Sequence, residues 1–206
     1  VHYASLRHFT GAGKFVDSYQ EDETTDFHTM VSEMADIPRK QAKTINLGLF
    51  YGMGKGKLMS QLGVNLETAS ELLASYNERV PFVKQLMNDT MNKAGKKGYL
   101  STLEGRRCRF DQWEPTNEWG QKSLPLAEAQ QQYGEHMIKR AWTYKALNRL
   151  IQGSAADQTK KAMLELDKEG YLAHIQVHDE LDFSVASDAD KAKIKDIMEN
   201  CVELAV

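Results

Sequence analysis

The hydrophobic pattern of this chain is mainly that of amphipathic helices. Apolar residues recur at intervals of three and four over residues 1–20 and 67–97, with a break near Pro81 in the second range. We expect residues 125–168 to be mostly helical, and another apolar helical face runs over residues 194–205. Such spacing puts the apolar side chains on one face of each helix. The pattern therefore predicts a predominantly helical fold.

Two ranges have the alternating pattern of β-strands instead. Apolar residues occupy every second position on either side of an acidic turn: Ala173, Ile175, Val177, Leu181, Phe183 and Val185. We expect a half-buried strand pair there, with its turn at residues 178–180. Residues 98–110 predict a second pair that turns near Gly105, and residues 111–124 predict a loop. The expected fold class is α+β, predominantly helical, with a short antiparallel hairpin.

Length and composition are those of an ordinary globular protein. The 206 residues suit one domain or two tightly joined subdomains, and 41% are hydrophobic while 27% are charged. No apolar run is long enough to span a bilayer, so we expect no membrane association. Cys108 and Cys201 are too few and too far apart for a disulfide framework or a zinc site. A reducing, cytoplasmic setting is the expectation.

Positive charge is concentrated in three segments although the net charge is −3. Residues 37–66, 93–109 and 136–156 carry net charges of +5, +5 and +4, which leaves −17 for the remainder. This segregation predicts a basic cleft in an acidic body, suited to phosphate-bearing partners. The alternative, that the three segments do not meet in space, stays open.

The candidate chemistry centres on residues 38–57, where proline at the start and glycines at the end predict one helix. Side chains four residues apart form a stripe about 18 Å long on this helix: Arg39, Lys43, Leu47 and Tyr51. Two cations near the positive end of the helix dipole favour an anionic ligand such as a polyphosphate. Gly48 and Gly52 lie on a neighbouring stripe, where bare backbone lets a flat molecule approach.

The same stretch also fits a lysine-bearing amphipathic helix with a glycine-rich C-cap. A Walker-type phosphate loop is excluded, because neither Lys55 nor Lys57 precedes Ser or Thr. Spacing alone does not decide between a phosphate-binding helix and an ordinary surface helix.

The order of residues here resembles the fingers-helix motif of family A (Pol I-like) DNA polymerases. The residues that carry the resemblance are Arg39, Lys43, Asn46, Leu47, Gly48, Tyr51 and Gly52. It implies that Arg39 and Lys43 grip the triphosphate of an incoming dNTP, that Tyr51 packs beside the nascent base pair, and that Gly52 lies at the DNA. Leu47 departs from the family, which usually has Phe or Tyr at this site against the sugar.

A segment before this helix resembles another part of the family. Asp26 is a plausible N-cap for a short helix, and Asp26-Phe27-His28 matches a segment whose His touches the dNTP phosphates. The short separation between His28 and Arg39 resembles phage members of the family. Taken without the resemblance, His28 fits a surface histidine equally well.

A second motif lies at the turn of the predicted hairpin. The run Gln-Val-His-Asp-Glu-Leu resembles the family's palm motif, in which the Asp binds divalent metal. Asp179 stands where the alternation predicts an apolar residue, and a buried carboxylate is costly unless it is paired or holds a metal. The resemblance implies two Mg²⁺ ions, with Asp179 as metal ligand and Glu180 and Lys43 also catalytic. An exposed acidic turn is the alternative.

Further residues are expected at the DNA. Asn148 and Gln152 share a helix face and match the family's pair at the primer end, where amide donors test base-pair geometry in the minor groove. A Thr-x-x-Gly-Arg-Arg segment resembles another family motif and implies phosphate contacts for Arg106 and Arg107. Pairing of these arginines with carboxylates is the alternative. His178 is also expected to contact DNA.

The resemblance implies three subdomain ranges: a palm-to-fingers helix (residues 1–14), the fingers (15–110) and part of the palm (111–206). The expected function is template-directed DNA synthesis from dNTP on a primer, in a phage-infected host cell, with primer–template DNA as partner and no processivity factor identified. We expect a fragment of a longer chain, lacking the first catalytic Asp and the thumb and inactive alone. A single-subunit RNA polymerase and a non-catalytic helical module that binds nucleic acid are the alternatives.

Overall fold

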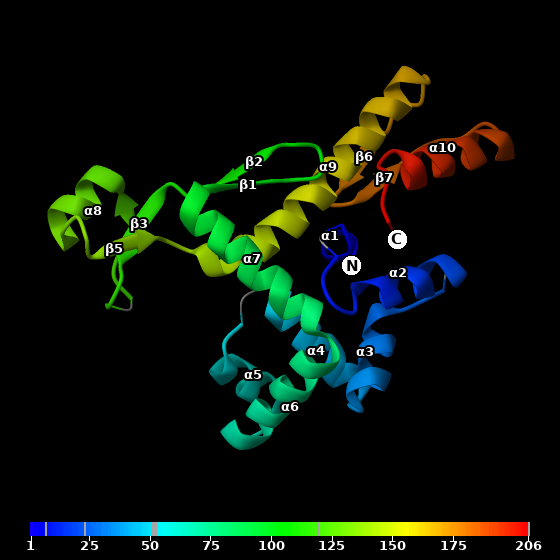
Figure 1. The fold of residues 1–206 in the computed structure, drawn as a ribbon. Helices are drawn as coiled ribbons and strands as arrows, with labels where there is room; N and C mark the ends of the chain where they lie inside the picture. The colour runs from blue at the N-terminus through cyan, green and yellow to red at the C-terminus, as the bar shows by residue number, and fades with distance from the viewer. Residues whose placement is uncertain (7, 23, 51–52, 119, 206) are drawn as a thin grey trace. The chain divides into compact units, whose positions relative to one another are not determined.

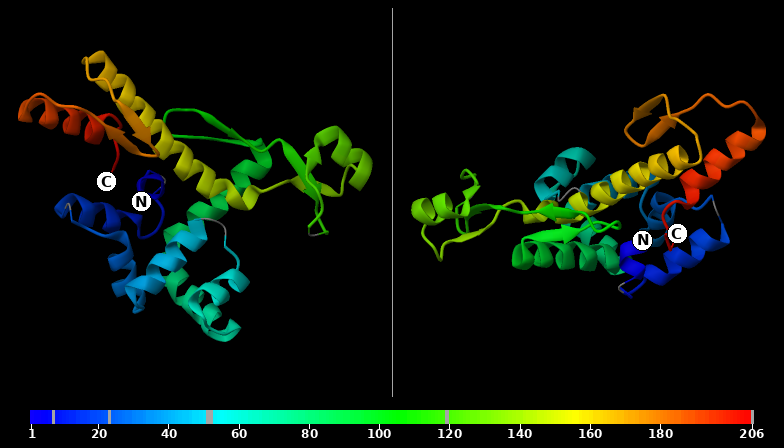
Figure 2. Two further views of the ribbon diagram at one scale, coloured as in Figure 1. Left: turned by 180° about the vertical axis from the view of Figure 1, so that it is seen from behind. Right: turned by 90° about the horizontal axis from the view of Figure 1, so that it is seen from above.

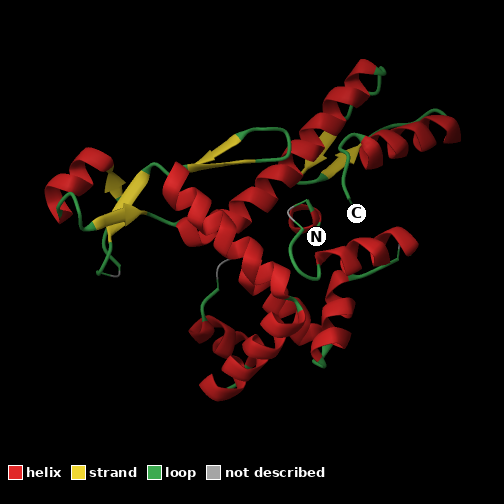
Figure 3. Cartoon of the chain, viewed as in Figure 1, coloured by secondary structure: helices red, strands yellow, loops and turns green. Residues whose placement is uncertain are grey.

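A computed structural model describes residues 1–6, 8–22, 24–50, 53–118 and 120–205. Helices predominate and the strands are short (Figure 3), which confirms the α+β, predominantly helical fold class. The elements in chain order (Figure 1) are α1 His2–Ser5, α2 Ala12–Glu21, α3 Phe27–Ala35, α4 Arg39–Phe50, α5 Lys55–Leu62, α6 Leu66–Arg79, α7 Pro81–Lys97, β1 Tyr99–Ser101, β2 Arg107–Arg109, β3 Gln112–Pro115, β4 Leu124–Pro125, α8 Leu126–Tyr133, β5 Ile138–Arg140, the 3-10 helix η1 Thr143–Lys145, α9 Ala146–Lys168, β6 Ile175–Val177, β7 Glu180–Asp182 and α10 Asp188–Asn200.

The chain forms two compact units, which are described separately. Unit 1 contains residues 1–100, 109–148 and 205–206, and unit 2 contains residues 101–108 and 149–204. The subdomain boundaries expected after residues 14 and 110 stay a prediction. Within the described ranges, no helix is long and apolar enough to cross a membrane.

Unit 1 is built on packed helices whose ends are set by local sequence. In it α3 packs on α4 and α6, and α6 packs on α5 and α7. Pro81 begins α7, as the break in the pattern predicted, because its ring fixes φ and its missing N–H is not needed in a first turn. An aromatic cluster fills the core, with ring centroids 5.3 Å apart for Phe15 and Phe27 and 5.1 Å for Phe15 and Phe82.

The two chain ends also meet within unit 1. The backbone N–H of Ala205 donates to Nδ1 of His2 at 2.9 Å, and the end markers lie together in both views of Figure 2.

The single helix predicted over residues 38–57 is wrong at its C-terminal end. Helix α4 ends at Phe50, and α5 begins at Lys55 after Gly54, whose extended backbone forms the N-cap. A Cβ on Gly48 would come within 1.7 Å of the Met53 side chain. The Met53 side chain therefore occupies the bare backbone that we expected a flat molecule to approach.

Unit 1 also contains a three-stranded antiparallel sheet, in the order β4-β3-β5, that the sequence pattern did not predict. Residues 112–115 form a strand where a loop was predicted, and the helix predicted over residues 125–168 is interrupted after Tyr133. Strands this short carry too few alternating positions to be detected. The Arg140 guanidinium lies 4.5 Å from the centroid of the Trp113 ring, which braces the central strand against β5.

In unit 2 the predicted hairpin is present but more exposed than expected. Strands β6 and β7 pair with Val177 opposite Glu180, which leaves residues 178–179 as a two-residue turn. Ile175 and Val177 are 57% and 49% exposed. The half-buried strand pair is therefore wrong for these two side chains, which share an exposed face, whereas Ala173, Leu181 and Phe183 are half-buried as expected.

Candidate active site

The predicted stripe on α4 is exposed along its described length. Arg39, Lys43 and Leu47 all face solvent, Leu47 with 39% of its surface accessible, while Ala42 and Ile45 on the other face are fully buried. The helix therefore presents its two cations outward because its apolar side is fixed in the core. Tyr51 and Gly52, the end of the predicted stripe, lie outside the described residues.

The first cation of the stripe is held by the N-cap of α3. Arg39 Nε donates to Asp26 Oδ2 at 2.9 Å and to Thr29 Oγ1 at 3.1 Å. Asp26 also accepts from the Thr29 backbone N–H, which confirms its predicted capping role. The hydrogen bonds from Thr29 and Arg39 outweigh desolvation and hold the pKa of Asp26 well below its usual range. The four Nη N–H donors of Arg39 lie outside the Asp26 ion pair.

The second cation and the predicted histidine belong to the same region. Helices α3 and α4 pack together, and Lys43 forms no ion pair within the described part of the chain. Partial burial lowers the pKa of His28, and the positive charges of Lys43 and Arg39 lower it further against the opposing charge of Asp26. Three predicted phosphate-binding side chains thus lie close enough to interact electrostatically.

A buried polar chain behind His28 was not predicted. The Tyr76 hydroxyl donates to Asn46 Oδ1 at 2.5 Å, and Asn46 Nδ2 lies 2.9 Å from His28 Nδ1. Asn46 and Tyr76 are fully buried. The sequence pattern gave neither Asn46 nor Tyr76 a functional role. The sequence signal that could have revealed this chain is the amide of Asn46, which follows Ile45 on the apolar face of an amphipathic helix.

The residues of the palm-like motif lie at the hairpin turn of unit 2. His178 adopts φ +54°, as hairpin turns of two residues require at their first position, and its carbonyl accepts from Gln176 Nε2 at 2.5 Å. Asp179 and Glu180 are exposed. Asp179 is therefore not the buried carboxylate that was expected, and the alternative of an exposed acidic turn is confirmed.

The described residues contain no group of three or more His, Cys, Asp or Glu side chains arranged to hold a metal ion. Asp179 and Glu180 supply the carboxylate oxygens that Mg²⁺ prefers, yet a hard cation needs further ligands such as water or phosphate. These two carboxylates are therefore of the type that binds Mg²⁺, but they are too few to complete its coordination. Lys43 and Asp179 belong to different units, so their convergence on one site stays a prediction.

Arg106 has protein partners within unit 2. Its Nε donates to Asp157 Oδ1 at 2.7 Å and its Nη2 to the Gly153 carbonyl at 2.8 Å. Asp157 is only 7% exposed. Hydrogen bonds from the Thr102 hydroxyl and Arg106 outweigh burial and lower the pKa of Asp157. These contacts give Arg106 a structural role. Its DNA contact stays a prediction, as do those of Arg107, Asn148, Gln152 and His178.

The Arg106 ion pair gives a stability prediction. Replacing Arg106 with leucine is expected to cost about 2 kcal/mol at neutral pH, because it leaves a buried carboxylate without its charged donor. The lowered pKa of Asp157 means that this contribution is present above the unfolded pKa and disappears as pH falls below about 4. Urea denaturation at neutral and at acidic pH measures the loss of stability and its dependence on pH, with R106L/D157N as the matched control. A loss of the same size in acid would contradict the assignment.

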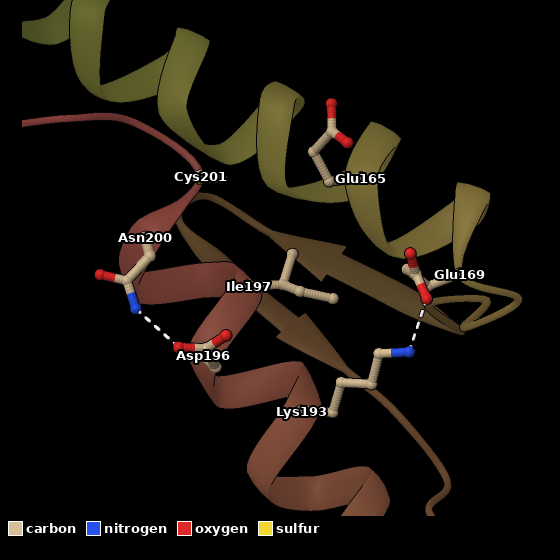
Figure 4. Close-up of a pocket in the computed structure, with 7 residues that line it drawn as sticks. All are labelled: Glu165, Glu169, Lys193, Asp196, Ile197, Asn200 and Cys201. Carbon is tan, nitrogen blue, oxygen red and sulfur yellow. Dashed lines mark hydrogen bonds and ion pairs between the residues drawn. The ribbon is translucent and has the colours of Figure 1, made fainter.

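A pocket between α9 and α10 in unit 2 is lined by none of the predicted site residues. It encloses about 290 Å³ and is lined by Glu165, Glu169, Lys193, Asp196, Ile197, Asn200 and Cys201 (Figure 4). Lys193 pairs with Glu169, and Asn200 Nδ2 donates to Asp196 Oδ1 at 2.8 Å. Because no predicted site residue lines it, this pocket is not the candidate site.

Known proteins similar to this chain belong to the same class. Residues 5–206 match the family described as DNA polymerase family A. A DNA-directed DNA polymerase of Pseudomonas phage M6 is 35% identical, covering 99% of this chain and 34% of the relative. The thermostable DNA polymerase I of Thermus aquaticus is 30% identical, covering 98% of this chain and 24% of the relative.

A solved structure is also similar. The POL domain of Pol1 from M. smegmatis, in complex with DNA primer-template and dNTP, aligns with a TM-score of 0.68 at 28% identity. The alignment covers 93% of this chain and 33% of that one. The chain therefore spans about a third, or less, of the length of these relatives.

Proposed function

The chain belongs to DNA polymerase family A, and we propose that it supplies the nucleotide-gripping helix and a metal-binding carboxylate for template-directed DNA synthesis. The observation that carries the proposal is the exposed pair of cations on α4 beside His28, in the order that the family motif has. Phosphoryl transfer depends on positioning and charge neutralisation more than on covalent chemistry by the protein. An outward-facing cation stripe on a rigid helix meets that requirement.

Each residue of the stripe has a proposed role toward dNTP. Arg39 and Lys43 bind the triphosphate, and His28 donates a further hydrogen bond to it. Leu47 packs on the sugar and Tyr51 beside the new base pair. Because Asp26 orients the Arg39 side chain in advance, less conformational freedom is lost when a phosphate binds.

We propose that the hairpin turn and α9 face the metal and the DNA. Family A polymerases generally use divalent metal ions, and Asp179, assisted by Glu180, would bind Mg²⁺ here. When bound, the ions supply Lewis acidity at the primer hydroxyl and the triphosphate. Asn148 and Gln152 contact the minor groove at the primer end, and Gly52, Arg106, Arg107 and His178 lie along the DNA. The phage relative favours action inside an infected cell.

Primer extension by the intact protein, measured with dNTP and with rNTP, tests the proposal. We expect extension of a DNA primer with dNTP and little extension with rNTP, in the presence of Mg²⁺. The reverse preference would indicate a single-subunit RNA polymerase. DNA binding without extension would indicate a nucleic-acid-binding module.

A further inference from the structure

The chain Tyr76–Asn46–His28 links the helix core of unit 1 to an imidazole at its surface. The three residues come from α6, α4 and α3, helices that pack together. Both inner members are fully buried and both hydrogen bonds are short, 2.5 Å and 2.9 Å. A buried polar group that lost its partner would destabilise the fold, so the arrangement is strongly determined.

We infer that Asn46 and Tyr76 are positioning residues that keep the proton of neutral His28 on Nε2 and offer that N–H to an anionic oxygen of the nucleotide. This rests on the proposed function, in which His28 meets the triphosphate. The family motif contains Asn46 but assigns it no role, and Tyr76 lies outside that motif.

The direction of each hydrogen bond follows from the buried end of the chain. A fully buried Tyr76 needs an acceptor for its O–H, and Asn46 Oδ1 is that acceptor. The amide of Asn46 therefore turns its NH₂ group toward His28, and Nδ1 of the imidazole has to accept. A neutral imidazole that accepts at Nδ1 carries its proton on Nε2. Fixing the tautomer in advance makes Nε2 a donor at any pH.

Partial burial and the two neighbouring cations also favour a neutral His28, against the charge of Asp26. Arg39 and Lys43 on α4 oppose an imidazolium, Asp26 at the start of α3 favours one, and Tyr76 on α6 stays neutral. An imidazolium would also direct a second N–H at the NH₂ group of Asn46, with no acceptor between them. The site thus holds a neutral donor beside two cations, which adds a hydrogen bond to the triphosphate without a third positive charge.

The variant Asn46→Asp tests the inference in the intact protein, because its carboxylate keeps the shape and still accepts from Tyr76. Its second oxygen accepts from Nδ1–H, so neutral His28 moves its proton from Nε2 to Nδ1. We expect the wild-type KM for dNTP to be nearly independent of pH around neutrality. In N46D the KM is expected to rise about tenfold as pH rises above the imidazole pKa, because neutral His28 then no longer donates from Nε2. A tenfold change corresponds to the loss of about one hydrogen bond to a charged group.

Two further variants separate positioning from structure. In H28Q, glutamine keeps an N–H donor that does not titrate, so N46D/H28Q is expected to lose the pH dependence. Y76F removes the hydroxyl that orients Asn46 and is expected to raise the KM with little change in kcat. Heteronuclear NMR of ring-labelled histidine should report Nε2–H in the wild type and Nδ1–H in N46D at alkaline pH.

The outcomes distinguish this inference from the proposed function. If primer extension occurs and H28Q changes the KM, but N46D gives the same pH profile as the wild type, the positioning role is wrong while the polymerase assignment stands. If N46D does not fold, the tautomer in the wild type and in Y76F decides: Nδ1–H in the wild type overturns the inference. If H28Q and Lys43→Ala both leave the KM for dNTP unchanged, the proposed function itself fails.

Discussion

Replacing Lys43 with alanine in the intact protein is expected to reduce kcat/KM for dNTP by about 100-fold or more, the range found when one charge-stabilising donor is removed from an active site. Lys43 is exposed on α4 and forms no ion pair in the described part of the chain, so its ammonium group is available to the triphosphate. Negative charge develops on the triphosphate toward the transition state, and a nearby ammonium group stabilises it. We therefore expect kcat to fall as well as KM to rise.

Lys40 provides the matched control. It is an exposed lysine on the same helix, three residues before Lys43 and off the predicted stripe. Steady-state primer extension by K43A, K43R and K40A shows whether activity depends on a positive charge at residue 43 or on the total positive charge of the helix. We expect K43R to keep part of the activity and K40A to keep nearly all of it. Equal losses in K40A and K43A would show that general positive charge, and not the stripe, binds the nucleotide.

Local signals in the sequence located the starts of these helices correctly. Asp26 caps α3 and Pro81 begins α7 because both effects depend on side chains within a few residues of a helix end. Helical spacing alone placed Arg39 and Lys43 on one stripe of α4. Features of this kind can be predicted from one sequence, since the residues that cause them are neighbours in the chain.

The rest of the candidate site depends on contacts that are distant in sequence. Asn46 and Tyr76 are separated by 30 positions, and Arg106 and Asp157 by 51. A single sequence contains no signal for either pair beyond a polar residue on an apolar face. Local pattern also misjudged burial at the hairpin, where Val177 alternates as a buried residue would but is exposed. Alternation specifies a shared face and leaves open what covers it.

Replacing Asp179 with alanine is expected to abolish nearly all turnover, by at least about 1,000-fold, because a carboxylate ligand to a catalytic ion supports several kcal/mol of charge stabilisation. The exposed turn argues that this loss is not a folding defect. Asp179 has no role in the β6–β7 ladder, which pairs Val177 with Glu180 on either side of it. DNA binding and thermal stability should therefore be retained in D179A while Mg²⁺-dependent extension is lost.

Asp182 is the control on the same hairpin. It is an exposed carboxylate on β7, and its backbone carbonyl, not its side chain, accepts from His174. D182A is expected to extend primers at close to the wild-type rate, with the same Mg²⁺ dependence. D179N, which keeps the shape and loses the charge, should resemble D179A. If D182A and D179A lose activity equally, the hairpin acts through its overall negative charge, and the assignment of Asp179 as the metal ligand is wrong.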